Sequence, residues 1–173
     1  LRTMSFAFVF PGQGSQSVGM MAAYGDAAVI RTTFDEASTT LGDDLWAMVA
    51  EGPAEALTQT VNTQPVMLTA GVAAWRLWLE KGGRKPAVVA GRSLGEYSAL
   101  VAAGVIDFRD AVPLVRLRAA AMQEAVPFGT GAMAAVLGLD DAGIVAACAE
   151  AAQGEVVEPV NFNAAGQTVI AGH

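Results

Sequence analysis

Hydrophobic residues occur along this chain in two patterns: short continuous runs and longer stretches with helical spacing. The runs 5–10 and 87–91 consist of small, aromatic and β-branched residues, and each ends in a glycine-containing turn. Such runs are typical of buried strands in a parallel sheet. In 65–81, by contrast, Leu68, Val72 and Trp75 recur at spacings of four and three, which predicts an amphipathic helix.

The same reasoning places the remaining elements of the first two thirds of the chain. Helices are expected over 20–41 with a break near Gly25, and over 44–51, 54–57 and 107–124. The polar residues 60–65 are expected to form a break before the helix at 65–81. Either Asp107 or Asp110 can cap the helix at 107–124.

Near 126–131 the composition changes to glycine, proline and threonine, which indicates a linker. Beyond it the pattern predicts a strand at 132–137, a helix at 140–153 and strands at 156–161 and 167–171. This β-α-β-β order begins a small α+β unit of the split βαβ type. We therefore expect an α/β protein with a large part at 1–127 and the start of a smaller one at 128–173.

Composition and charge narrow the class of protein. Of the 173 residues, 53% are hydrophobic and the net charge is −7, which fits a globular domain and argues against a nucleic-acid binder. No apolar run approaches the roughly 18 residues of a membrane span, and no signal peptide is evident. Residues 1–3 look like a leftover leader before Met4, and Cys148 like a buried thiol. We expect a cytoplasmic protein without a membrane anchor.

The stretch Gly91-Arg92-Ser93-Leu94-Gly95 has the form G-x-S-x-G and stands between a predicted strand and a predicted helix. In that context the pattern indicates a nucleophile elbow, a strained turn that exposes its serine. The start of the following helix would direct backbone N–H groups and the helix dipole towards an oxyanion formed on Ser93. The alternative is a glycine-rich turn without chemistry.

The loop Pro11-Gly12-Gln13-Gly14-Ser15-Gln16 follows the first predicted strand. It lacks both the G-x-G-x-x-G and the Gly-Lys-Ser/Thr pattern of phosphate-binding loops. Two interpretations remain: a plain connecting turn, or a loop whose backbone N–H groups line a site at the carboxyl end of the sheet.

A serine hydroxyl needs a base within hydrogen-bond reach, and the only histidine in the sequence is His173. Either His173 folds back onto Ser93, or the base lies beyond this chain, or the chain is catalytically incomplete. Arg116 and Arg118 lie among apolar residues of the predicted helix 107–124. Each can extend to solvent or bind an anion, and spacing alone does not separate them.

Several motifs together resemble the malonyl-CoA:acyl carrier protein transacylases of bacterial type II fatty acid synthesis. They are Phe8–Gln16, Gln64-Pro65, Gly91–Tyr97 and Gly131-Ala132-Met133, in the family's order along almost the whole chain. Val160–Asn163 and Val169–His173 also resemble that family's small subdomain. The resemblance implies an α/β-hydrolase-like parallel sheet core with an inserted, here incomplete, ferredoxin-like α+β subdomain.

The resemblance also implies the chemistry. Ser93 would carry the malonyl group as an ester, between coenzyme A and the pantetheine thiol of acyl carrier protein. The backbone N–H groups of Gln13 and Leu94 match the family's oxyanion hole, and Arg118 matches the arginine that pairs with the malonyl carboxylate. Malonyl-CoA and acyl carrier protein are the expected partners of a monomer. No metal and no cofactor is expected, since the coenzyme A thioester is the substrate.

Two departures from the family pattern affect the expected activity. The family usually has histidine where this chain has Arg92. The family's catalytic histidine and a supporting glutamine lie further along, so the chain resembles the N-terminal part of a transacylase, and poor turnover is expected.

Two other functions remain open: a serine esterase or thioesterase, and a non-catalytic fragment that binds acyl-CoA or a carrier protein. Because carrier proteins are acidic, their docking surface should be locally basic. The candidate residues for that surface are Arg84, Lys85, Arg109 and Arg116.

Overall fold

The computed structural model describes residues 5–126 and 129–173. It divides into two compact units, Leu1–Met122 and Gln123–His173, and each is described by itself. The boundary expected at 127/128 falls on residues outside the described ranges, as does the expected leader at 1–3.

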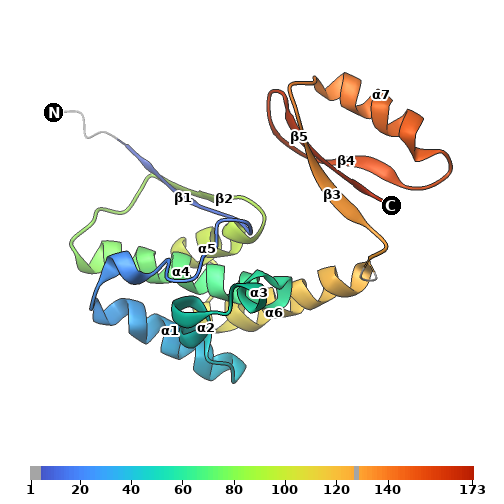
Figure 1. Cartoon of the computed structure of the whole chain (residues 1–173). Helices are drawn as coiled ribbons and strands as arrows, with labels where there is room; N and C mark the ends of the chain where they lie inside the picture. Colours follow the sequence, from blue (N-terminus) through green and yellow to red (C-terminus); the bar gives the residue numbers. More distant parts are fainter. Residues whose placement is uncertain (1–4, 127–128) are drawn as a thin grey trace. The chain divides into compact units, whose positions relative to one another are not determined.

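The first unit combines helices with a small parallel sheet (Figure 1). Its strands are β1 (Ala7–Phe10) and β2 (Val88–Gly91). Its helices are the 3-10 turn η1 (Ala22–Tyr24), α1 (Ala28–Leu41), α2 (Leu45–Glu51), α3 (Ala54–Thr58), α4 (Thr60–Glu80), α5 (Leu94–Ala102) and α6 (Phe108–Ala125).

Strands β1 and β2 pair in parallel with Ala7 opposite Val88 and Phe10 opposite Gly91. Both predicted strands are therefore confirmed. One face of the pair packs on α4 and α5, where Phe10 and Trp75 are buried. Because the strands run in the same direction and end in register, the segments that follow them begin side by side. This arrangement positions the site.

Most of the core of this unit lies between helices. Buried aliphatic and aromatic residues of α1, α2, α4 and α6 form one cluster, with Phe34, Leu68 and Val112 fully shielded from solvent. Leu94, the first residue of α5, also belongs to this cluster. The start of α5, and with it the turn before it, is thus held by the main core.

The expectation of a polar break at 60–65 is wrong, because α4 begins at Thr60 and includes Pro65. The polar side chains there turn inward and satisfy the end of α3. Asn62 Nδ2 donates to the Ala56 carbonyl, and Thr63 Oγ1 donates to the carbonyls of Leu57 and Gln59. The polar residues of this turn therefore cap the preceding helix while they remain helical themselves.

The start of α6 selects between the two possible caps. The helix begins at Phe108, and Asp107 Oδ1 accepts a hydrogen bond from the Arg109 backbone N–H at 2.8 Å. Asp107 is therefore the capping residue, and Pro113 lies inside the helix.

The second unit consists of β3 (Ala132–Leu137), α7 (Asp141–Ala152), β4 (Val157–Ala164) and β5 (Gln167–Gly172). The strands form an antiparallel sheet in the order β3-β5-β4. Helix α7 packs on β4 and β5, with Ile144, Cys148 and Thr168 buried. The predicted β-α-β-β order and the buried position of Cys148 are confirmed, although β4 runs three residues further than expected.

Within residues 5–126 and 129–173, none of the helices combines the length and the apolar character needed to cross a bilayer.

Candidate active site

Ser93 occupies the turn between β2 and α5 in a backbone conformation that few side chains adopt, with φ 52° and ψ −118°. The two glycines that flank it are sterically required. A methyl group on Gly91 would overlap the Gly95 carbonyl, and one on Gly95 would overlap the Phe10 carbonyl. The strand, turn and helix therefore approach more closely than any other residue type would allow, and Ser93 is left exposed.

The loop after β1 lies against this turn. A methyl group on Gly12 would come within 2.9 Å of the Arg92 carbonyl oxygen and 3.8 Å of Ser93 Cβ. The next residue, Gln13, is tied to α4, since its Nε2 donates to Thr60 Oγ1 at 3.1 Å. The glycine-rich loop and Ser93 are thus neighbours at the carboxyl ends of the two strands.

Two backbone N–H groups near Ser93 are free to bind a ligand. The neighbouring N–H groups of Gly95 and Glu96 are not free, because they donate to the carbonyls of Arg92 and Ser93, respectively. Among the described residues, the N–H groups of Gln13 and Leu94 donate to no protein acceptor. Leu94 is the first residue of α5, where unpaired N–H groups and the helix dipole favour an anion.

Arg118 of α6 brings a positive charge to the serine. Its Nη2 donates to Ser93 Oγ at 3.1 Å, its Nη1 donates to Gln64 Oε1 at 2.7 Å, and its Cζ lies 5.7 Å from the centre of the Tyr97 ring. Arg116, one half-turn away, instead forms an ion pair with Asp43 at 2.6 Å. The structure therefore separates the two arginines that spacing left equivalent.

Gln64 and Tyr97 also belong to the site, although sequence patterns predict no role for either. Gln64 is fully buried and Tyr97 half-buried. Gln64 lies in the turn of α4 that was expected to be a break, so its direction could not be anticipated. The only signal was its place in the Gln64-Pro65 motif.

His173 is engaged within the second unit. Its Nδ1 accepts a hydrogen bond from the Val156 N–H at 3.3 Å, and its own backbone N–H donates to the Val156 carbonyl at 3.0 Å. The unit that holds Ser93 contains no histidine.

Arg92 does not disturb the backbone of the turn. Its carbonyl accepts the Gly95 N–H at 2.9 Å, as the first turn of α5 requires, and its side chain is exposed. Nothing in the structure explains why an arginine stands at this position.

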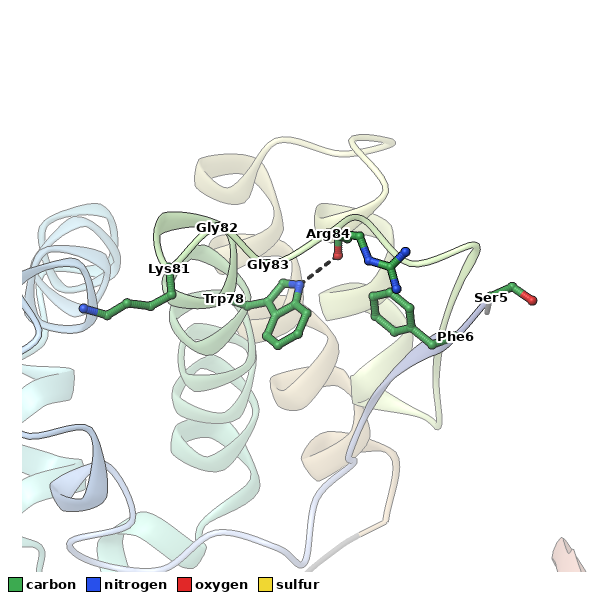
Figure 2. A pocket seen from close by; sticks show the side chains of 7 residues that line it. All are labelled: Ser5, Phe6, Trp78, Lys81, Gly82, Gly83 and Arg84. Carbon is green, nitrogen blue, oxygen red and sulfur yellow. Dashed lines mark hydrogen bonds between the residues drawn. The ribbon is translucent and has the colours of Figure 1, made fainter. Parts of the chain in front are cut away.

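A separate hollow of about 550 Å³ lies at the opposite, amino-terminal end of the two strands. Figure 2 shows the Trp78 indole N–H donating to the Arg84 carbonyl, and the Arg84 guanidinium beside the Phe6 ring. Its remaining lining residues are Ser5, Lys81, Gly82 and Gly83. This hollow shares no residue with the surroundings of Ser93.

The four basic residues considered for carrier docking differ in their surroundings. Arg109 pairs with Glu36 at 3.1 Å and Arg116 with Asp43, whereas Arg84 lies over Phe6. Where a carrier protein would dock stays a prediction.

The described part of the chain contains no cluster of three His, Cys, Asp or Glu side chains placed to hold a metal ion. The groups gathered at Ser93 are therefore a hydroxyl, a guanidinium, a buried amide and free backbone N–H groups. Such a set can bind a short acyl group that carries a carboxylate at one end and develops negative charge on its carbonyl oxygen during reaction at the other.

Comparison with known proteins identifies similar sequences. The chain is 64% identical over 169 residues to the malonyl CoA-acyl carrier protein transacylase of Escherichia coli K12, a match that covers 97% of this chain and 55% of that protein. It is 47% identical over 168 residues to the protein of that name from Bacillus subtilis, covering 96% of this chain and 53% of that protein.

Solved structures give the same result. An acyl-carrier-protein S-malonyltransferase from Burkholderia pseudomallei superposes with a TM-score of 0.94 at 64% identity, over 98% of this chain and 55% of that one. A malonyl-transacylase solved in complex with its type II polyketide acyl-carrier protein matches with a TM-score of 0.94 at 60% identity, over 98% and 55% of the respective chains.

The chain thus spans about 55% of the length of the relatives it matches. The sequence profile of the acyl transferase domain matches residues 7–173, which include the β1 loop, the Ser93 turn and Arg118. The chain belongs to the acyl transferase domain family.

Proposed function

We propose that this chain carries the acyl-binding half of a malonyl-CoA:acyl carrier protein transacylase of fatty acid synthesis. One observation carries the proposal: the Arg118 guanidinium, which no carboxylate of the described residues neutralises, lies 3.1 Å from the hydroxyl of a serine in a strained strand-to-helix turn. A serine ester next to a free cation suits an acyl group with its own carboxylate.

In the proposed first step, Ser93 Oγ attacks the thioester carbon of malonyl-CoA. The C–O bond forms and the C–S bond breaks, while a base takes the serine proton and returns it to the departing sulfur, so that coenzyme A leaves as the thiol. In the second step the pantetheine thiol of the carrier protein attacks the seryl ester. A C–S bond forms, the C–O bond breaks, and Ser93 recovers its proton.

Both steps develop negative charge on the carbonyl oxygen. We assign its stabilisation to the backbone N–H groups of Gln13 and Leu94, which have no acceptor among the described residues and follow neighbouring strand ends. A donor of this kind contributes on the order of 3 kcal/mol to the transition state. Neither N–H needs to move, because Leu94 is anchored in the core and Gln13 is bonded to Thr60.

Arg118 would hold the free carboxylate of the malonyl group. A guanidinium has five N–H donors, and Gln64 and Ser93 occupy one each. Three donors remain, enough for a two-pronged contact with a carboxylate. Acetyl, which lacks the second carboxylate, would gain nothing from this contact.

Acyl carrier protein is the proposed acceptor, since one solved relative is described in complex with its carrier protein. The cytoplasmic location and the monomeric state expected from the sequence stay predictions.

Ser93 must give its proton to a base, and the first unit contains no histidine that could accept it. The arginine at Ser93 Oγ is a hydrogen-bond donor and cannot accept the proton. We therefore expect the 173-residue polypeptide to load malonyl slowly, and imidazole added to the buffer to accelerate loading of Ser93. A rate that imidazole leaves unchanged would show that another group already serves as the base.

The test of the proposed function is the mass of the intact polypeptide after incubation with malonyl-CoA or with acetyl-CoA. We expect one malonyl group per chain, little acetyl, and no adduct on the Ser93→Ala variant. Equal loading of both acyl groups, followed by their release to water, would instead favour a serine esterase or thioesterase. Binding of both thioesters with no adduct would favour a non-catalytic fragment.

We also propose a fold family for each of the two units. Strands β3 and β4 are joined by α7, both pair antiparallel with β5, and β5 lies between them. This is the split βαβ arrangement and supports a ferredoxin-like subdomain. The strand, elbow and helix at Ser93 support an α/β-hydrolase-like core.

A further inference from the structure

We infer that Gln64 is a positioning residue that holds Arg118 at Ser93 without neutralising it, and thereby sets the preference for an acyl group that carries a carboxylate. The inference rests on the proposed function for its substrate class. Its evidence comes from the contacts between α4 and α6.

Gln64 is fully buried, which is costly for a carboxamide unless both of its ends are bonded. Its Oε1 accepts the Arg118 Nη1 hydrogen bond at 2.7 Å, and its Nε2 donates to Met122 Sδ at 3.4 Å. Arg118 and Met122 are one helical turn apart on α6. Gln64 therefore spans that turn with its two ends, which fixes the side chain in place.

The two partners also fix which end of the carboxamide faces Arg118. A thioether sulfur only accepts hydrogen bonds, and a guanidinium only donates them. If the carboxamide were reversed, its N–H groups would face the N–H groups of Arg118, and its oxygen would face the sulfur. Met122 thus keeps Oε1 of Gln64 directed at the guanidinium.

The Gln64 side chain is uncharged, so it holds Arg118 without neutralising the guanidinium. Four other arginines of the described residues pair with carboxylates: Arg31, Arg76, Arg109 and Arg116. Arg118 instead has two neutral oxygen partners, from Gln64 and Ser93, and the face of Tyr97. Glutamate has almost the shape of glutamine, but it would give Arg118 a permanent counter-ion and compete with a substrate carboxylate.

Two substitutions of Gln64 distinguish its effect on the position of Arg118 from its effect on the net charge around Arg118. Gln64→Glu keeps the shape and the contact with Arg118 but supplies a negative charge. Gln64→Met keeps Arg118 uncompensated but removes the oxygen that holds it. The matched control is Gln123→Glu, which makes the same change of charge at an exposed residue of α6.

The experiment measures dissociation constants for malonyl-CoA and acetyl-CoA by equilibrium titration in the Ser93→Ala background, where no ester can form. We expect Gln64→Glu to weaken malonyl-CoA binding at least tenfold and Gln64→Met about threefold. Acetyl-CoA binding should stay within twofold in both, and Gln123→Glu should leave both constants within twofold. When Arg118→Ala is also present, Gln64→Glu should have no further selective effect.

Equal weakening of both thioesters by Gln64→Glu and Gln64→Met would overturn the inference, because it would mark Gln64 as purely structural. So would the absence of any preference for malonyl-CoA with Gln64 intact. Thermal unfolding of each variant identifies one that does not fold, and the other Gln64 variant then decides. Failure of the proposed function is a separate outcome. A Gln64-dependent preference for malonyl-CoA in binding, together with no malonyl ester on the chain that retains Ser93, would refute acyl transfer and still support the positioning role of Gln64.

Discussion

At the scale of single residues, the site depends on the Arg118 guanidinium, which has no counter-ion among the described residues. Arg116 and Arg118 lie on the same helix, yet Arg116 pairs with Asp43 and Arg118 contacts Ser93. A charge-assisted hydrogen bond contributes about 1.5–3 kcal/mol. That amount is enough to discriminate a malonyl from an acetyl group if the carboxylate reaches the guanidinium.

Arg118→Ala should therefore lower the rate of malonyl loading roughly 10- to 150-fold and change acetyl loading far less. Arg116→Ala is the matched control, since it removes the same charge from the same helix without touching Ser93. Loading rates for both thioesters, measured by intact mass, provide the comparison. Equal losses for malonyl and acetyl in the Arg118 variant would contradict the role assigned to it.

Gln13→Ala should reduce loading less than tenfold, whereas loss of a true oxyanion donor costs about 10²–10³-fold. The reason is that alanine keeps the backbone N–H and loses only the side-chain bond to Thr60. The same loading assay measures it. A loss as large as that of Ser93→Ala would mean that the Gln13 side chain itself takes part in the reaction.

Sequence reasoning predicted the residues of this site unevenly. Ser93 and its two glycines were evident because G-x-S-x-G between a strand and a helix has a specific steric cause. Arg118 emerged only through the family resemblance, because helical spacing gives neighbours along one helix and says nothing of the helix packed against it. The contact of Arg118 with Gln64 joins residues 54 positions apart, and no local pattern encodes it.

At the scale of elements, the turn at Ser93 exists because three backbone segments pack at glycine positions. Gly95 lies against the Phe10 carbonyl of β1, and Gly91 against the first turn of α5. The loop at Gln13 follows β1 directly, so the packing that permits the elbow also brings the Gln13 N–H, the second of the proposed oxyanion donors, close to it.

Gly95→Ala should lower the free energy of unfolding by about 3 kcal/mol or more, because the added methyl meets backbone atoms that cannot rotate away. Urea titration followed by tryptophan fluorescence measures it. Glu96→Ala, the next residue of the same helix and exposed, is the control and should change stability by less than about 0.5 kcal/mol. A Gly95→Ala chain as stable as the control would show that the close approach is not required.

The elements that sequence patterns predicted well are those with a continuous apolar run or a clear cap, such as β1, β2 and α7. The predicted start of α4 was wrong because the Thr, Asn, Gln and Pro residues in 60–65 are typical of a turn when their local sequence is considered alone. In the folded chain their side chains bond to carbonyls of the preceding helix. Tertiary context thus overrode local propensity at the position where Gln64 enters the site.

At the scale of the whole molecule, the two units have separate hydrophobic cores. The first contains the large cluster between helices, whereas among the described residues of the second only two hydrophobic side chains, Ile144 and Cys148, are buried. The sequence indicated a change near 126–131 from composition alone. It could not give the extent of each core, which depends on packing between distant segments.

The two units should unfold at different urea concentrations, the second at the lower one, because its buried apolar area is small. The sequence supplies independent reporters. All three tryptophans, Trp46, Trp75 and Trp78, lie in the first unit, and the single cysteine, Cys148, lies in the second. Labelling of Cys148 by a thiol reagent should rise before tryptophan fluorescence changes. Coincident transitions would contradict independent cores.

The most direct test of the central claim is the mass of the intact chain after prolonged incubation with equal concentrations of malonyl-CoA and acetyl-CoA, followed by mapping of the modified peptide. The account predicts a single malonyl ester on Ser93, with malonyl in clear excess over acetyl, and none on Ser93→Ala. An adduct at another residue, acetyl in equal amount, or no adduct even with imidazole present would contradict it.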